Sequence, residues 1–152
     1  MEYFAPTALQ DAVDFLQQSG KAGVAIVAGA TDWFPARGDR PLHQPVMDIT
    51  KIAELQGIER TAQGWRFGAA ATWSDIVKAD LPSCFAGLKA AAREIGSVQI
   101  QNVATLAGNL CNASPAADGV PPLLTLDAAV EIASLSGVRS VPLTEFVLGV
   151  RQ

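Results

Sequence analysis

The chain has 152 residues, of which 49% are apolar, and its formal net charge at pH 7 is −4. This length and apolar content allow one compact domain or two small lobes and exclude wholesale disorder. The acidic balance argues against a nucleic-acid partner, which needs a basic face, and no apolar run is long enough to cross a bilayer. The N-terminus lacks the features of a signal peptide, so we expect a cytoplasmic protein.

The first 50 residues have the pattern of a small α/β lobe. Thr7 to Gln10 has the form of a capping box, and apolar residues then recur at helical spacing as far as Gly20, which can end the helix. The apolar run at 22–30 predicts a buried strand. We expect a loop over 29–38, which contains two Gly and a Pro, and a second strand over 45–49.

The following residues predict a second, larger lobe, with the boundary near residues 51–57. We expect first a hairpin over 57–70 with Trp65 and Phe67 on one face, and then a short helix from Thr72 to about Ala79. A stronger helix follows, capped by Ser83 and stopped by Gly96. We then expect a short helix over 118–126 with Pro121 and Pro122 in its first turn, and two strands over 128–143 joined at Ser136 and Gly137. The last residues begin a further helix, so the chain is either a small domain or a piece of something longer.

Side chains that could carry catalysis are sparse. Cys84 and Cys111 form no CxxC motif, which argues against an iron–sulfur cluster or a zinc ribbon within the chain. His43 is the only histidine and no nucleophile-elbow motif accompanies it, so we assign no catalytic residue and no metal ligand. Any chemistry is expected to belong to a bound cofactor.

Two segments rich in small residues carry the functional signal: "VAGATDW" at 27–33 and "TLAGNLCNASPAAD" at 105–118. Small residues let a ligand approach the backbone, and exposed N–H groups can then bind an anion. No Lys or Arg occurs over 102–138, so a phosphate there would be held by backbone amides and neutral polar side chains. The alternatives are an ordinary strand-to-loop turn for the first segment and packing beside a helix for the second.

Acidic and aromatic residues near these segments each allow two interpretations. Asp32 and Asp118 would repel a phosphate, so a functional role predicts bonds to loop amides or sugar hydroxyls, and the alternative is a turn or helix cap. Trp33 and Trp73 fit either stacking on a flat ring or packing in the core.

The order and spacing of the two segments resemble the FAD-binding domain of the molybdenum hydroxylases, a family that includes the FAD subunit of xanthine dehydrogenase and the medium subunit of carbon monoxide dehydrogenase. "AGATDW" matches the family's A-G-G-T-D-L-like loop. "TLAGNLCNASPAAD" matches its T-x-G-G-N loop and A-S-P-x-S-D stretch. "FGAAATWSDI" and "VEIASLSGVRSVPLTEFVLGVR" also fit, so the resemblance covers essentially the whole chain.

The resemblance implies an α+β, two-lobed FAD-binding fold of the vanillyl-alcohol-oxidase/xanthine-dehydrogenase type, with lobes at 1–55 and 56–152, the second incomplete, and FAD in the cleft between them. It implies pyrophosphate contacts from the backbone of Val27, Ala28, Gly29, Ala30, Thr31, Asp32 and Trp33. It implies further cofactor contacts from Thr105, Ala107, Gly108 and Asn109, from Asn112, Ser114 and Asp118 to the sugar and chain of the cofactor, and from Ile95 as an apolar wall.

Four positions depart from the family pattern. Ala30 and Ala107 stand where the family has Gly, and a Cβ is a penalty at either position if the backbone needs a positive φ. Gln101 stands where many members have Arg, and Ala117 stands where a Ser is common. Family members also continue well beyond position 152 and carry a separate C-terminal domain, so we expect the chain to be truncated.

The implied function is electron transfer. FAD on this chain would receive electrons from a 2Fe-2S small subunit, which receives them from a molybdopterin-binding large subunit, and would pass them to NAD⁺, oxygen or a quinone. One alternative is a diverged, non-catalytic module that binds a nucleotide or partner subunits. Another is a vanillyl-alcohol-oxidase-type enzyme acting directly on substrate, against which the absence of an obvious base counts.

Overall fold

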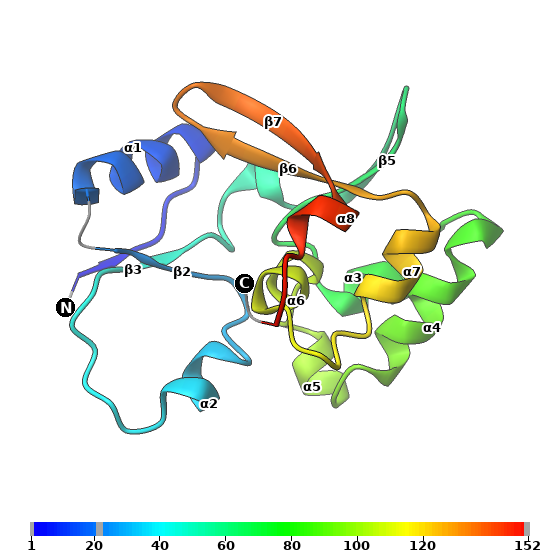
Figure 1. The fold of residues 1–152 in the computed structure, drawn as a ribbon, viewed down its shortest axis with the longest axis horizontal. Helices are drawn as coiled ribbons and strands as arrows, with labels where there is room; N and C mark the ends of the chain where they lie inside the picture. The colour runs from blue at the N-terminus through cyan, green and yellow to red at the C-terminus, as the bar shows by residue number, and fades with distance from the viewer. Residues whose placement is uncertain (1, 21–22, 151–152) are drawn as a thin grey trace.

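The computed structural model describes residues 2–20 and 23–150. We call residues 2–55 the first lobe and residues 56–150 the second lobe, following the division proposed from the sequence. Figure 1 shows the first lobe around strands β1 to β3 and the second lobe around helices α3 to α7. The architecture mixes helices with three small sheets, as the predicted α+β class requires.

The first lobe is built on a three-stranded parallel sheet in the order β1-β3-β2. The strands are β1 (Tyr3–Phe4), β2 (Ala25–Val27) and β3 (Val46–Asp48). Strand β3 pairs with both neighbours, so β2 keeps one unpaired edge. The apolar run at 22–30 predicted a buried strand, but Ile26 in the middle of β2 is 53% exposed.

Helix α1 (Leu9–Ser19) covers one face of this sheet, where Ala12 packs with Met47 and Ile52. The predicted capping box is wrong, because the helix starts at Leu9 and no side chain of its own first turn caps it. A carboxylate from a distant position acts instead: Glu54 Oε1 accepts a hydrogen bond from the Leu9 N–H at 3.1 Å. Gly20 ends the helix at φ +57°, as predicted.

The other face of the sheet is covered by the segment that follows β2. The loop predicted over 29–38 contains a helix, α2 (Trp33–Arg37). Pro35 is the third residue of that helix, where the backbone N–H has no intrahelical acceptor, so proline does not prevent the turn from forming. Trp33 and Leu42 pack against a cluster of buried residues on β2 and β3.

The second lobe contains the remaining elements. In chain order after a short 3₁₀ turn at Ala53–Leu55, they are β4 (Ile58–Thr61), β5 (Gly64–Phe67), α3 (Trp73–Lys78), a 3₁₀ turn (Ser83–Phe85), α4 (Ala86–Glu94), α5 (Val98–Gln101), α6 (Leu106–Asn112), α7 (Val120–Thr125), β6 (Ala129–Ser134), β7 (Gly137–Pro142) and α8 (Leu143–Phe146).

Most of these elements lie where the sequence predicts them. Both hairpins form, with the turn of the second at residues 135–136, and Thr72 caps α3 through a capping box with Asp75. Ser83 does not cap α4 as predicted, because a 3₁₀ turn precedes the helix and no side chain caps it. Helices α5 and α6 were not predicted.

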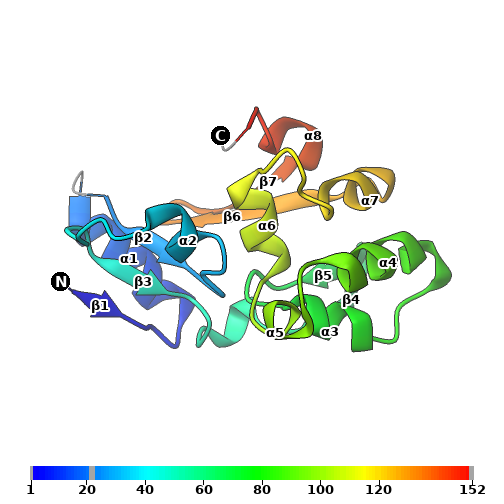
Figure 2. The ribbon, with the colours of Figure 1, turned by 90° about the horizontal axis from the view of Figure 1, so that it is seen from below.

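The core of the second lobe centres on Trp73, Ile76 and Leu88, which are at most 1% exposed. Trp65 and Phe67 pack against it from one face of the β4–β5 hairpin, as predicted. Figure 2 shows α3, α4 and α5 on one side and the β6–β7 hairpin reaching from the second lobe toward the first. Within the described ranges, no helix has the length and apolarity to cross a membrane.

Candidate functional site: a cleft between the lobes

The two small-residue segments meet at a cleft of about 310 Å³. The first lobe contributes Ile26, Val27, Ala28, Gly29, Ala30, Thr31, Asp32, Trp33 and Ala36. The second lobe contributes Trp73, Ala104, Thr105, Gly108, Asn109, Cys111 and Asn112. The structure therefore brings together residues about 75 positions apart that the sequence singled out on two separate segments.

Gly29 is a point at which the two lobes touch. A Cβ at this position would lie 2.0 Å from the carbonyl oxygen and 2.5 Å from the carbonyl carbon of Val103, and 2.9 Å from the Cα of Ala104. These are backbone atoms, which cannot move aside as the end of a flexible side chain can. Gly29 is therefore needed for close approach of the two lobes, in addition to any role toward a ligand.

The backbone after β2 presents a run of free donors. No acceptor in the described parts of the chain takes a hydrogen bond from the N–H groups of residues 28–32. The ladder with β3 ends at Val27, whose carbonyl accepts from the Ile49 N–H at 3.0 Å. Ala30 then adopts φ +53° and reverses the chain before α2. Successive free N–H groups around a left-handed residue are the geometry of an anion-binding concavity.

The opposite wall is helix α6. Its N-cap is Thr105, which is 3% exposed and whose Oγ1 accepts from the Gly108 N–H at 3.0 Å. Backbone hydrogen bonds fix this end of the helix to the segment before α3: the Trp73 N–H donates to Ala104 O at 3.1 Å, and the Leu106 N–H donates to Ala71 O at 3.2 Å. Residues 106–112 of the second segment therefore form an anchored helix rather than a loop.

Helical spacing explains which residues of α6 face the cleft. Gly108, Asn109 and Asn112 follow Thr105 by three, four and seven positions, and this spacing places all four on one face of the helix. The buried residues Leu106 and Leu110 lie on the other face, against the core.

Asn109 carries an atom that the protein leaves unsatisfied. Its Oδ1 is buried and has no hydrogen-bond partner among the described residues. Gly119 lies beside it, where a Cβ would come within 2.8 Å of Oδ1 and 2.7 Å of the Trp73 ring. Leaving a buried acceptor unpaired costs about 1–3 kcal/mol, so any donor that reached this oxygen would be favoured.

The cleft therefore fits a ligand that offers anionic oxygens to one wall and hydroxyl groups to the other. Free backbone amides on the first lobe suit a diphosphate, and the orphaned oxygen on the second lobe suits a sugar or sugar-alcohol hydroxyl. FAD contains both kinds of group. Within residues 2–20 and 23–150, no set of three or more His, Cys, Asp or Glu side chains is placed to hold a metal ion.

Four predicted site residues lie outside the lining of this cleft. Ala107 is in the first turn of α6, and Ile95 follows α4 and packs on the core of the second lobe. Ser114 Oγ accepts from the Ala116 N–H at 3.2 Å in a local turn. Asp118 is exposed, two residues before α7. Asp32 does line the cleft and occupies the N-cap position of α2, but its side chain makes no capping bond.

The two Ala-for-Gly departures have different consequences. Ala30 is at φ +53°, a conformation that costs a residue with a Cβ about 1–2 kcal/mol, so the expected penalty is present there. Ala107 lies within α6 and is not among the positive-φ residues, so no such penalty arises. The other two departures have structural surroundings of their own: Gln101 donates to the Arg93 carbonyl at 3.0 Å, and Ala117 is buried.

Several lining residues were not predicted: Ile26, Ala36, Ala104 and Cys111. The helical period would have identified Cys111, because it follows Gly108 by three positions. Cys111 is an exposed residue, but partial burial of its thiol raises the pKa of that group above its ordinary value. Trp73 is 1% exposed and packs in the core, which confirms one of its two interpretations, and it also lines the cleft. Its stacking on a flat ring stays a prediction.

A two-lobed α+β domain with free backbone amides across a cleft from a polar helix face belongs to the class of nucleotide-cofactor-binding domains. The family model described as "FAD binding domain in molybdopterin dehydrogenase" matches residues 1–152. The chain belongs to this family, and its cofactor is FAD.

Curated relatives agree with this family. The chain is 38% identical over 151 residues to the nicotinate dehydrogenase FAD-subunit of Eubacterium barkeri, covering 97% of the chain and 51% of that protein. It is 37% identical over 152 residues to the xanthine dehydrogenase FAD-binding subunit of Escherichia coli O157:H7, again covering 97% of the chain and 51% of that protein. The chain spans about half the length of these relatives.

Solved structures confirm the fold. Carbon monoxide dehydrogenase from Hydrogenophaga pseudoflava superposes with a TM-score of 0.91 at 27% identity, over 100% of this chain and 53% of that one. Quinoline 2-oxidoreductase from Pseudomonas putida 86 gives the same TM-score, identity and coverage. The predicted fold of the xanthine-dehydrogenase type is therefore correct.

Proposed function

We propose that this chain is the FAD-binding, electron-transfer part of a molybdenum-hydroxylase-type oxidoreductase that works in the cytoplasm. Its FAD would receive electrons from a 2Fe-2S small subunit, supplied in turn by a molybdopterin-binding large subunit, and would deliver them to an external acceptor. The observation that carries the proposal is the run of free amides at 28–32, set across a cleft from Thr105 and Asn109. The names of the relatives, which are FAD subunits of dehydrogenases, support it.

The first lobe would hold the pyrophosphate of FAD without a cation. Among the residues that the structure describes, no Lys or Arg lines the cleft, so the N–H dipoles of residues 28–32 would supply the positive potential. The orientation of these amides would be fixed before the ligand binds. Gly29 packs against the backbone of Val103, and helix α2 starts at Trp33, directly after the amide run. Preorganised donors lose little conformational entropy when the ligand arrives.

The second lobe would orient the polyol and sugar of the cofactor. Asn109 would accept from a hydroxyl at its orphaned oxygen, and Thr105 and Asn112 would contribute from the same helix face. Ala107, Ser114, Asp118 and Ile95 remain proposed contact residues whose role depends on how far FAD extends beyond the cleft. When bound, FAD supplies the redox chemistry, and the protein positions it.

A second candidate is a module that binds a nucleotide or partner subunits without redox turnover. The observation in its favour is Ala30, whose φ of +53° strains the middle of the amide run. In this case the loop would keep its shape and bind FAD weakly.

The visible spectrum of the purified protein, with and without added FAD, separates these candidates. Flavin absorbance that co-elutes with the protein supports the flavoprotein. A colourless protein that fails to retain FAD, both as this chain and with the C-terminal region of its relatives restored, contradicts the FAD assignment. In a protein that does bind, the double variant Thr105→Val, Asn109→Ala should lose affinity. Unchanged retention would exclude α6 as the binding helix.

A further inference from the structure

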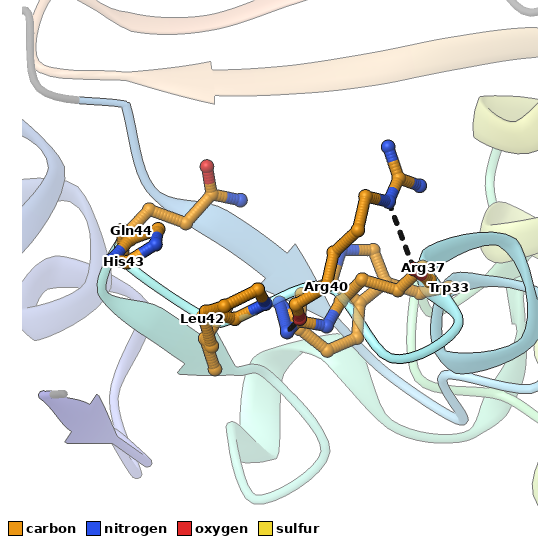
Figure 3. Close-up of a pocket in the computed structure, with 7 residues that line it drawn as sticks. Trp33, Arg37, Arg40, Leu42, His43 and Gln44 are labelled. Carbon is orange, nitrogen blue, oxygen red and sulfur yellow. Dashed lines mark hydrogen bonds between the residues drawn. The ribbon is translucent and has the colours of Figure 1, made fainter.

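A second hollow, of about 440 Å³, adjoins the FAD cleft and shares Trp33 with it. It is lined mainly by Trp33, Arg37, Arg40, Leu42, His43 and Gln44, all from α2 and the segment that leads to β3 (Figure 3). The FAD-binding role proposed above uses none of these residues except Trp33. The volume is within the usual range for small-molecule sites.

The charge of this hollow differs from that of the chain as a whole. The chain carries a net charge of −4, yet its only histidine and two arginines line the hollow, and no Asp or Glu does within the described ranges. Neither arginine forms an ion pair with a described residue. The two ion pairs among the described residues both involve Arg66, which lies outside the hollow. Arg37 and Arg40 are therefore available to an external anion.

Backbone carbonyls hold both guanidinium groups in place. Arg40 donates from Nε to Arg37 O at 2.9 Å and from Nη2 to Ala36 O at 2.5 Å, and Arg37 donates to Arg40 O. Capping the C-terminal end of α2 is one consequence of these bonds. A guanidinium has five N–H donors, so these bonds leave four on Arg37 and three on Arg40.

An aromatic ring completes the arrangement. The Arg37 guanidinium carbon lies 5.4 Å from the centre of the Trp33 ring, close enough for a cation–π contact. The guanidinium groups supply forked donors that match phosphate oxygens, and the indole that Arg37 covers forms an aromatic wall beside them. Forked donors fixed next to such a wall suit the phosphate groups of a nucleotide.

We propose that this hollow binds the phosphate groups of a nucleotide, with Arg37 and Arg40 as the phosphate ligands and Trp33 as a wall shared with the FAD cleft. Two sources offer this chemistry. One is a free nucleotide bound beside FAD, and the other is the AMP half of FAD itself, reaching out of the adjoining cleft. The proposal goes beyond the proposed function, in which neutral amides alone hold FAD.

Calorimetric titration with ADP tests the proposal, on FAD-free protein and on protein loaded with FAD. The key variant is Arg37→Gln, Arg40→Gln. Its matched control is Arg60→Gln, Arg139→Gln, which removes the same charge from exposed positions on β4 and β7. Circular dichroism checks that each variant folds. If the Gln variant does not fold, Arg37→Lys, Arg40→Lys keeps the charge and loses the fork.

A free nucleotide is identified as the ligand of the hollow if the FAD-loaded protein binds ADP and this affinity falls at least 10-fold in the key variant but not in the control. The AMP half of FAD is identified as the ligand of the hollow by two results together. The FAD-loaded protein fails to bind ADP, and the key variant binds FAD at least 10-fold more weakly than the control does. The Lys variant should lose a smaller part of the same affinity. Equal ADP and FAD affinities in the key variant and the control would overturn the proposal. If the key variant retains flavin absorbance while its affinities equal those of the control, the proposed FAD-binding function stands and only the nucleotide site in the hollow is overturned.

Discussion

The two walls of the cleft have similar sequences and different structures. Residues 28–32 form an irregular turn whose backbone N–H groups make no hydrogen bond within the described chain. Residues 106–112 form a helix whose first turn is capped by Thr105 and tied to the strand-like segment before α3. Each segment contains an Ala-Gly pair, at 28–29 and 107–108, yet the first offers its backbone to a ligand and the second offers its side chains.

The difference shows that small residues serve several purposes in one site. Gly29 is required because the other lobe leaves no room for a Cβ, whereas a Cβ on Gly108 would meet only Thr105 Oγ1, at 3.0 Å. Ala30 carries strain that Gly would relieve, and Ala107 carries none. A description of the site as two glycine-rich loops would miss each of these distinctions.

The largest expected effect comes from Gly29→Ala. The added Cβ would overlap backbone atoms of Val103, so the lobes must separate. We expect a loss of about 3 kcal/mol in the free energy of unfolding, at the upper end for overpacking, together with loss of FAD retention. Denaturant unfolding and flavin absorbance measure the two effects.

Gly87→Ala is the matched control. Gly87 is inside α4, where a Cβ would meet only Pro122, at 3.9 Å. The same change should raise stability by about 0.5–1 kcal/mol, because glycine is unfavourable in a helix interior. Equal effects of the two substitutions would contradict a special role for Gly29 between the lobes.

Asn109→Ala should separate stability from binding. The substitution removes a buried acceptor that has no partner and adds a good helix former, so the apoprotein should keep or gain stability. FAD affinity should fall about 5–10-fold, as expected for one hydrogen bond of about 1 kcal/mol. Thermal melting and FAD titration measure these quantities. A fall in both would indicate a structural role for Asn109 instead.

A pair of Gly substitutions compares the walls directly. Ala30→Gly should stabilise the protein by up to about 1 kcal/mol, because it relieves a positive φ. Ala107→Gly should destabilise it by about 1 kcal/mol, because Gly is a poor residue inside a helix. Chemical denaturation of the two variants gives the sign of each change in the free energy of unfolding. Matching signs would mean that the two walls do not differ as described.

The smallest effect concerns the cap of α1. The hydrogen bond from the Leu9 backbone N–H lowers the pKa of Glu54 below its ordinary value. A carboxylate whose pKa is lower in the folded state stabilises the protein above its unfolded pKa of about 4.3 and loses that effect as the pH falls through the folded value. Glu54→Gln should therefore melt at a lower temperature than wild type at pH 7, and the gap should close below about pH 4. A gap independent of pH would exclude this linkage.

Local patterns in the sequence predicted much of the fold. The hairpin that contains Trp65 and the helix that starts at Thr72 both depend on contacts between neighbours in the chain, and both are present. The cap on α1 was predicted wrongly because its carboxylate comes from Glu54, 45 positions away. No local pattern contains that information.

The sequence predicted which residues line the cleft better than it predicted their local structure. The resemblance brought 27–33 and 105–118 together, and the structure places most of these residues around one cleft. The helical form of 106–112 was missed because its small residues suggested a loop. The spacing of Leu106 and Leu110 behind an N-cap Thr was the available signal. The approach of Gly29 to Val103 has no counterpart in either segment alone.

Hydrogen exchange of backbone amides, measured on the protein with and without FAD, tests the central claim most directly. The account predicts that FAD slows exchange at residues 28–32, whose N–H groups are free in the protein alone, and at the cleft face of α6. Amides of the β6–β7 hairpin, which contributes no residue to the cleft lining, should be unchanged. Protection by FAD that leaves residues 28–32 unaffected would contradict the assignment of these amides as the pyrophosphate site.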